Sequence, residues 1–352
     1  MKLEFAPYEL VFKEPAGTSR GVMLRKKTYF LRYSDPDSGI SGYGEAAIFE
    51  GLSPEAGSNY ESILRKLSRS VSQGEHFDIS DYSSVVFGFE QAKADFENGG
   101  KGIYFDSPFI SRHRPITING LIWMGTRRKM LERIENKLQE GFGCIKIKIG
   151  AIDWDDEIAM LKAIRDRFSV REIELRVDAN GAFSAKDCLE KLDRLSRYDI
   201  HSIEQPIKPG NWKAMSELCE HSPVPIALDE ELIEIKDTQE RERMLETIKP
   251  QYIILKPALC FGFSGASSWI KAAEQRNVGW WITSALESSV GLDAIAQYTG
   301  LKNPEIPQGL GTGALYENNF SSPLTLEGDK LFFNDQPSIF RKELEQLTWI
   351  SE

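Results

Sequence analysis

The sequence predicts an α/β protein, a modified TIM-like (β/α) barrel with an α+β capping domain. Three observations support this prediction. Eight strand-like segments alternate with helical segments from about residue 115 onward. Polar residues recur near the ends of these strands, about once per strand–helix unit. The residues before 115 follow another order, with strands first and helices afterwards. We therefore expect a capping domain over 1–114, joined by the tail 320–352, and a catalytic barrel over 115–319.

The amino-terminal part contains two strand-like and two helical segments. The first strand-like segment, VMLRKKTYFLRYS, has the β-rich character of a strand, and the turn residues SDPDSG follow it. The second helical pattern runs into the breaker NGGKG. In chain order, the four segments cover residues 22–34, 42–47, 54–71 and 82–97. Another strand-like segment, LTLEGDKLFFN (324–334), follows the barrel, and we expect the tail to pack with the amino-terminal part over the barrel mouth.

The barrel strands are predicted from short apolar runs at even spacing. They are ITINGLIW (116–123), CIKIKIG (144–150), EIELRVDAN (172–180), IHSIEQPI (200–207), PIALDEE (225–231), YIILKPAL (252–259), GWWITSALE (279–287) and EIPQGLGT (305–312). The first helices between them are expected over 126–141, 153–168, 184–197 and 211–220. An open doubly wound sheet would alternate in the same way. The even spacing, and a first helix that no GxGxxG motif opens, favour the barrel.

The run CIKIKIG combines a strand pattern with two lysines. Successive strand side chains point to opposite faces, so Lys146 and Lys148 share one face and the isoleucines share the other. Polar residues recur in the following strands at steps of 25 to 30 residues. The six positions are Lys148, Asp178, Glu204, Asp229, Lys256 and Ser284. In a barrel these side chains would surround one mouth, which is where barrel active sites lie.

Three carboxylates from adjacent strands would be costly to bring together without a cation. Oxygen ligands select a hard ion, so we expect Mg²⁺, with Mn²⁺ as a substitute, and the four scattered histidines disfavour zinc. Arg176 and Asn180 share the inward face with Asp178. Each is expected either to contact substrate or to make a structural hydrogen bond inside the barrel.

Beside a metal, a lysine becomes a candidate base. Like charge and desolvation are both expected to lower the pKa of Lys146 and Lys148 toward neutrality. Lys256 lies four strands further around the ring and should approach from the opposite side. This arrangement suits removal of a proton next to a carboxylate.

Composition limits the partners. The 43 basic and 53 acidic residues give a net charge of −10, which disfavours nucleic acid and anionic membranes as partners. The four cysteines form no CxxC pair, no apolar run approaches 18 residues, and the start lacks the apolar core of a signal peptide. We expect a cytoplasmic protein that acts on a small carboxylate substrate, with its homo-oligomeric state left open.

The motifs, taken together in this order, resemble those of the enolase superfamily and of its muconate-lactonizing subgroup. They are KIKIG, RVDAN, IEQPI, ALDEE, ILKPAL, SALESSVGL and GLGTG, with FGFEQAKADF (87–96), INGLIWMG (118–125) and GEAAIFEGLSPE (44–55) in the remaining parts of the chain. The last of these resembles the family's capping-domain loop that closes over substrate. The resemblance implies that Asp178, Glu204 and Asp229 are magnesium ligands. It further implies that Lys148 is the catalytic acid/base, with Lys146 as its helper and Lys256 on the opposite face. Glu231 departs from the family pattern, where serine is common, and we expect it at the rim of the site.

The resemblance also implies a reaction. Ser284, Gly309 and Gly311 match the region around a succinyl carboxylate of the substrate. The motif set is most similar to that of a carbon–oxygen lyase of menaquinone biosynthesis, which dehydrates 2-succinyl-6-hydroxy-2,4-cyclohexadiene-1-carboxylate. A 1,1-proton transfer on N-acylamino acids or dipeptides is the alternative. A catalytically silent barrel is disfavoured, because all three expected ligands and Lys148 are present.

Overall fold

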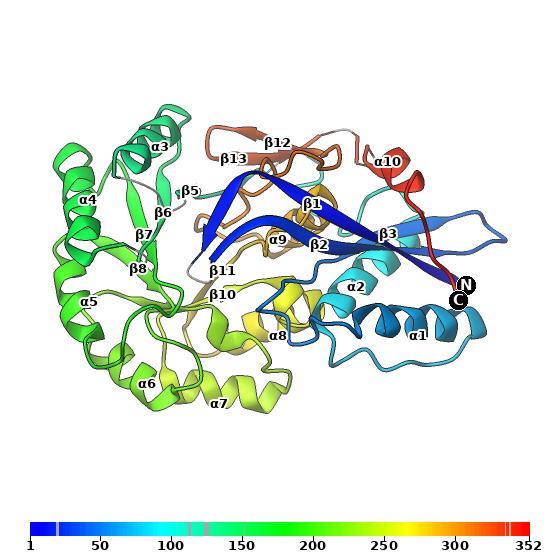
Figure 1. Ribbon diagram of the computed structural model, residues 1–352, viewed down its shortest axis with the longest axis horizontal. Helices are drawn as coiled ribbons and strands as arrows, with labels where there is room; N and C mark the ends of the chain where they lie inside the picture. Colours follow the sequence, from blue (N-terminus) through cyan, green and yellow to red (C-terminus); the bar gives the residue numbers. More distant parts are fainter. Residues whose placement is uncertain (19–20, 112–113, 123–126, 151, 335, 338) are drawn as a thin grey trace.

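A three-stranded antiparallel sheet at the amino terminus lies beside the barrel (Figure 1). The computed structural model describes residues 1–352 except 19–20, 112–113, 123–126, 151, 335 and 338. Within the described residues this sheet has the order β1-β2-β3, with bounds Lys2–Thr18, Gly21–Ser34 and Ser41–Ala46. Helices α1 (Tyr60–Gln73) and α2 (Ser83–Glu97) pack against it.

Two features of this part differ from expectation. We predicted no strand in the segment that forms β1, which contains Pro7 and Pro15. Because β1 is an edge strand, the missing N–H groups of its prolines are tolerated. The helix expected over 54–71 begins only at Tyr60, because the preceding residues 50–59 form turns.

The barrel is confirmed as a ring of parallel strands. In the part of the chain that the structure describes, seven strands pair in sequence order: β5 (Gly120–Ile122), β6 (Cys144–Lys148), β7 (Glu174–Asp178), β8 (Ile200–Glu204), β9 (Ile226–Leu228), β10 (Tyr252–Leu255) and β11 (Gly279–Ile282). The expected eighth strand is reduced to two parallel bridges, Ile118–Gln308 and Thr283–Gly309. These bridges join the two edges of the sheet, which excludes the open doubly wound alternative.

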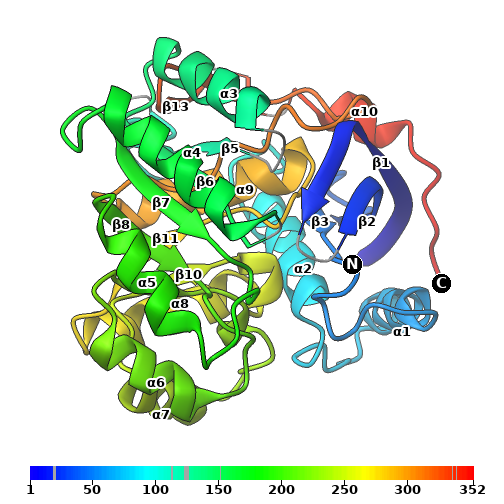
Figure 2. The ribbon, with the colours of Figure 1, turned by 60° about the vertical axis from the view of Figure 1, so that its left-hand side comes forward.

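Helices cover the outside of the strands (Figure 2). They are α3 (Arg127–Gln139), α4 (Trp154–Arg167), α5 (Cys188–Ser196), α6 (Trp212–His221), α7 (Thr238–Ile248), α8 (Gly262–Glu274) and α9 (Ser289–Lys302). Two short 3₁₀ helices, η1 (Glu230–Leu232) and η2 (Pro257–Leu259), follow β9 and β10. Each therefore lies at the carboxyl end of a barrel strand.

The position of β6 between the outer helices and the barrel interior explains why lysines alternate with isoleucines along this strand. Ile145, Ile147 and Ile149 are fully buried in the same core cluster as Leu161 of α4. Lys146 and Lys148 point the other way and line a pocket in the barrel mouth. Apolar burial on one face of the strand thus orients both ammonium groups inward.

The carboxyl-terminal tail follows the expectation only in part. Its last residues do join the amino-terminal sheet: Phe5 and Ile350 exchange backbone hydrogen bonds, and Arg341 of α10 (Arg341–Glu345) donates to Ser41 O at 2.7 Å. The hairpin of β12 (Leu324–Glu327) and β13 (Lys330–Phe333) instead pairs with β4 (Ile116–Thr117). Because β4 precedes β5, the hairpin lies at the amino-terminal end of the first barrel strand, away from the mouth, and that part of the prediction is wrong.

Some expectations fall on residues outside the described ranges. They are the end of the first barrel-strand motif, 123–125, and the first position of the helix expected over 126–141. In the ranges that are described, no helix combines the length and the apolar character needed to cross a membrane. The four cysteines are all buried free thiols: Cys144, Cys188, Cys219 and Cys260.

Candidate active site

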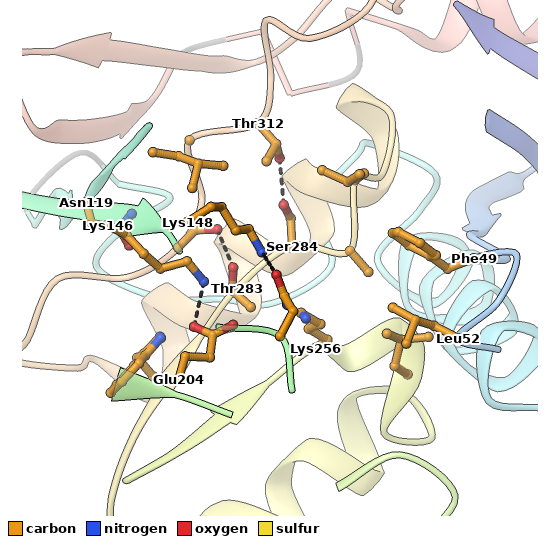
Figure 3. Close-up of a pocket in the computed structure, with 18 of the residues that line it drawn as sticks. Phe49, Leu52, Asn119, Lys146, Lys148, Glu204, Lys256, Thr283, Ser284 and Thr312 are labelled. Atoms are coloured by element: carbon orange, nitrogen blue, oxygen red, sulfur yellow. Dashed lines mark hydrogen bonds and ion pairs between the residues drawn. The ribbon is translucent and has the colours of Figure 1, made fainter. Parts of the chain in front are cut away.

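A pocket opens at the carboxyl ends of the barrel strands (Figure 3). Charged side chains from successive strand ends line it: Lys146, Lys148, Glu204, Glu230 and Lys256. The loop after β3 adds Phe49 and Leu52, which face this charged wall in Figure 3. The pocket therefore has an ionic wall from the barrel and an apolar wall from the amino-terminal part.

The paired lysines of β6 reach two different carboxylates. Lys146 Nζ donates to Glu204 Oε2 at 2.6 Å and lies 3.1 Å from Asp178 Oδ2. Lys148 Nζ donates to Asp178 Oδ2 at 2.6 Å and to Asn180 Oδ1 at 2.7 Å. The strand register explains this contact, because Lys148 is the direct partner of Asp178 across the β6–β7 ladder.

Lys256 enters the pocket from β10 and forms an ion pair with Asp229. Burial alone would lower the pKa of Lys256, but Asp229 and the neighbouring Glu230 and Glu204 raise it to about 12. Lys256 is therefore a cation in this arrangement. Lys148 and Lys256, the two lysines expected on opposite faces of the substrate, are thus each paired with a carboxylate.

The charge state of the β6–β8 cluster differs from expectation. Burial lowers the pKa of Lys146, but Asp178 and Glu204 outweigh it and hold that pKa above the ordinary value. The lowering expected from the neighbouring Lys148 is therefore wrong for Lys146. Burial raises the pKa of Asp178, yet Lys146 and Lys148 bring it below the ordinary value. Burial and the neighbouring Asp178 raise the pKa of Glu204 well above the ordinary value for a glutamate.

Two observations bear on whether this cluster could hold a cation. Glu204 Oε1 is buried and has no hydrogen-bond partner among the described residues. Four carboxylates (Asp178, Glu204, Asp229 and Glu230) face three ammonium groups here, and the donor atoms are oxygens, which suit a hard cation. In this structure the lysines contact the carboxylates. Among the described residues, no three acidic, histidine or cysteine side chains form a complete metal-binding cluster.

Glu230 was missed by the sequence reasoning. It directly follows Asp229 in the motif ALDEE, and its Oε1 accepts a hydrogen bond of 3.1 Å from Asn180 Nδ2. Asn180 in turn accepts from Lys148, so one amide links a lysine to a further carboxylate. The adjacent acidic residue in the motif was the available signal. Phe49 and Leu52 lie in the motif GEAAIFEGLSPE (44–55), which was expected to be a loop that closes over substrate, although the two residues were not singled out.

Arg176 does not line the pocket. Its side chain is buried within the barrel, where it pairs with Glu174 at 2.8 Å and donates to Pro307 O at 2.9 Å. Its guanidinium carbon lies 4.5 Å from the ring centroid of Trp281, which does line the pocket. Of the two roles considered for Arg176, the structure shows the hydrogen bond inside the barrel.

A further part of the pocket wall comes from the end of β11, next to β10, and from the eighth strand position. Ser284, Gly309 and Gly311 all line the pocket, and Ser284 Oγ lies 2.7 Å from Thr312 Oγ1. A Cβ atom at Gly309 would lie 2.2 Å from Thr283 Oγ1. This is the close backbone approach typical of a required glycine.

Glu231 lies beside the pocket, as expected for a rim residue: it borders an adjoining hollow that shares Asn180 and Glu230 with the pocket. It is buried, with 4% of its surface accessible, and both of its carboxylate oxygens accept hydrogen bonds. Its partners are Gln205 and Gly210, which belong to the loop after β8, and the side chain of Trp212 at the start of α6. Glu231 is thus at the rim of the pocket, but its carboxylate is held by hydrogen bonds within the protein.

The geometry can be compared with known proteins. A sequence model of the enolase C-terminal domain-like family matches residues 129–337. The chain is 46% identical over 365 residues to the o-succinylbenzoate synthase of Desulfotalea psychrophila, across 94% of this chain and 98% of that protein. It is 26% identical over 282 residues to an L-amino acid-D/L-Glu epimerase of Francisella philomiragia, across 74% and 76% of the two chains.

Solved structures show the same fold. The crystal structure of MenC from Desulfotalea psychrophila superposes with a TM-score of 0.86 at 40% identity, covering 94% of this chain and 99% of that one. A muconate lactonizing enzyme from Pseudomonas fluorescens gives a TM-score of 0.81 at 21% identity, covering 98% of each chain. The barrel and the amino-terminal sheet are thus both part of the shared architecture.

Proposed function

Since this chain belongs to the enolase superfamily, we propose that it is a carbon–oxygen lyase that dehydrates 2-succinyl-6-hydroxy-2,4-cyclohexadiene-1-carboxylate to o-succinylbenzoate. The observation that carries this choice of reaction is the 46% identity, over almost the whole chain, to a protein named o-succinylbenzoate synthase. The pocket supports it with lysines at two strand ends and an apolar wall that suits a six-membered carbon ring. On this proposal the reaction belongs to menaquinone biosynthesis.

We propose that Asp178, Glu204 and Asp229 hold Mg²⁺, for which Mn²⁺ can substitute. The unpartnered Glu204 Oε1 and the excess of carboxylates over ammonium groups support this assignment. Bound there, the cation would supply positive charge that offsets the charge developing on the substrate carboxylate and favours a neutral lysine nearby. The three side chains come from consecutive strands β7 and β8 and the end of β9.

Lys148 is the proposed base. Its amine takes the proton from the ring carbon that bears the carboxylate, and the electron pair of that C–H bond moves onto the carboxylate, from which it returns to form a ring C=C bond as the C–O bond breaks. The ammonium group so formed then gives the proton to the departing hydroxyl, the C–O bond breaks, and water leaves as the ring becomes aromatic. Asn180, which accepts from Lys148 Nζ, orients that amine. Lys146 assists through its charge, and Lys256 stabilises the ring from the other side by cation–π attraction.

We further propose that residues 1–114, with part of the tail 320–352, act as a cap on a barrel of residues 115–319. Phe49 and Leu52 support this division, because they bring apolar surface from the amino-terminal part into the pocket. Ser284, Gly309 and Gly311, which line the pocket at the end of β11 and at the eighth strand position, are proposed to contact the succinyl carboxylate. Water exclusion by the apolar wall would strengthen the ionic contacts.

A second candidate is racemisation or epimerisation. Lys148 and Lys256 both line the pocket, and two lysines on opposite faces are the equipment for a 1,1-proton transfer. The epimerase of Francisella philomiragia, at 26% identity, is consistent with this alternative. The two candidates differ in whether Lys256 must exchange a proton.

The test compares three lysine variants in the dehydration assay with the cyclohexadiene carboxylate. We expect Lys148→Ala to lower kcat by about 10³-fold, because it removes the general base. Lys256→Arg keeps a cation and should retain measurable dehydration. Lys66→Ala, on the exposed face of α1, is the matched control and should behave as the native protein. Undiminished dehydration by Lys148→Ala would refute the proposed role of Lys148.

A further inference from the structure

A buried hydrogen-bond network ties the end of β8 to the end of β9. Its centre is Gln205, which directly follows Glu204 and is fully buried. Gln205 Oε1 accepts from the backbone N–H of Asp229 at 3.1 Å and from that of Glu231 at 3.2 Å. Its Nε2 donates to Ile207 O at 3.0 Å and to Glu231 Oε2 at 3.1 Å. One amide side chain thus joins the backbones that present two of the proposed cation ligands.

The orientation of this amide depends on Glu231. A carboxylate only accepts hydrogen bonds, so it must face the NH₂ group of Gln205. A flipped amide would place Oε1 against the carboxylate and NH₂ against two backbone N–H donors. Glu231 Oε1 also accepts from the backbone N–H of Gly210 at 2.8 Å, which fixes the far end of the loop after β8.

The backbone at this point is strained. Gln205 has a φ of 37°, in the left-handed region that non-glycine residues seldom adopt. Its carbonyl accepts from Gly181 N–H at 2.6 Å, and its own N–H donates to Ala227 O at 2.9 Å. A residue in such a conformation persists only where its surroundings determine it. The side-chain bonds of Gln205 to Glu231 are part of those surroundings.

We propose that Glu231 is a positioning residue: through Gln205 it fixes the backbone from which Glu204 and Asp229 project, and so sets the affinity of the site for a divalent cation. The inference rests on the proposed role of Glu204 and Asp229 as cation ligands. It is independent of catalysis itself, because Glu231 faces the loop after β8 and does not line the pocket.

Two substitutions separate the interactions. Glu231→Ala removes both acceptors and leaves Gly210 N–H and Gln205 Nε2 without them. Glu231→Gln has a similar shape but only one acceptor oxygen, so the donors that faced the other oxygen lose their acceptor. Glu234→Gln is the matched control, because Glu234 is an exposed carboxylate three residues along the chain. Ile270→Val on α8 controls for a small loss of stability away from β8 and β9.

The first readout is the dissociation constant for Mg²⁺, measured by titration calorimetry on the full chain. Substitutions beside metal ligands typically cost about 10- to 100-fold in affinity. We expect about a 10-fold or greater rise for Glu231→Ala, a smaller rise for Glu231→Gln, and constants within about two-fold of the native value for both controls. Native affinity in Glu231→Ala would overturn the proposal.

The second readout is amide hydrogen exchange of the full chain without added cation. Glu231→Ala should speed exchange in peptides that contain Gly210 and Asp229, while the controls leave them protected. If exchange is unchanged, Glu231 does not position this backbone and the inference fails. If exchange rises but the native chain binds no Mg²⁺, the positioning role stands and the proposed cation site fails. The two failures are therefore distinguishable.

Discussion

Replacing Glu287 by glutamine should change how the stability of the protein depends on pH. Glu287 is fully buried, directly after the pocket residues Ala285 and Leu286, and its Oε2 accepts from Ala285 N–H at 2.7 Å. Burial raises its pKa from 4.5 to about 7, with Lys26 opposing the rise and Glu45 adding to it. The group is thus close to half protonated at neutral pH.

The sign and size follow from linkage. Because the folded-state pKa is raised, protonation of Glu287 favours the folded state; this contribution is complete below pH 4.5 and is lost as the pH rises through about 7. At about 1.4 kcal/mol per pKa unit, the full effect is about 3.5 kcal/mol, of which about 2.5 kcal/mol falls between pH 5 and 8. Glutamine cannot ionise, so Glu287→Gln should lack this loss and be more stable than the native protein at pH 8.

The assay is urea unfolding of both proteins at pH 5, 6, 7 and 8. Asp95, whose pKa burial raises to about 6, titrates in both proteins and cancels in the comparison. Glu327→Gln in β12 removes an exposed carboxylate instead and should keep the native pH dependence. Parallel curves of unfolding free energy against pH for the native protein and Glu287→Gln would refute the reasoning.

Three further predictions concern the site and its supports. Removing any one proposed cation ligand should nearly abolish dehydration, and full activity after exhaustive chelation would contradict the assignment; the variants are Asp178→Asn, Glu204→Gln and Asp229→Asn. Glu45→Ala should lower the unfolding free energy by about 3 kcal/mol and raise KM. The reason is that Glu45 Oε2 accepts from Ser288 Oγ at 2.6 Å and from Ser288 N–H at 3.0 Å, at the start of α9. Unchanged urea unfolding would count against this prediction. Gly309→Ala should cost about 1–3 kcal/mol, because its Cβ would meet Thr283 Oγ1 at 2.2 Å, and native stability in the same assay would show that Thr283 can yield.

The barrel could be predicted because two periods coincide in the sequence. Period-two alternation orients Lys146 and Lys148 inward, and the repeat of the strand–helix unit brings them to the same mouth as Glu204 and Lys256. Neither of these two inferences requires knowledge of contacts between residues that are distant in the sequence. Local pattern was therefore sufficient for the barrel and for the three lysines and Glu204 in the ionic wall of the pocket, but not for Glu230.

Depth within the barrel could not be predicted in the same way. Arg176 shares a strand face with Asp178, but it lies two residues nearer the amino-terminal end, which is about 7 Å deeper. At that depth it meets Glu174 and the ring of Trp281. Periodicity predicts the face of the strand on which a side chain lies, but not the residues that the side chain contacts there.

Long-range placement was the other limit. The hairpin 324–333 pairs with β4, at the opposite end of the first barrel strand from the mouth. The pKa of Lys146 likewise depends on Asp178 and Glu204, which lie in later strands. Each of these features is set by tertiary contacts between distant segments.

The central claim is that this pocket dehydrates a cyclohexadiene carboxylate. The most direct test is to measure kcat/KM of the purified native protein with Mg²⁺ for two reactions. The first is this dehydration, and the second is racemisation of an N-succinylamino acid, which is monitored by deuterium uptake from heavy water into each enantiomer. We expect dehydration to be the more efficient reaction by a wide margin. Efficient racemisation with negligible dehydration would contradict the proposal and assign Lys148 and Lys256 to a 1,1-proton transfer.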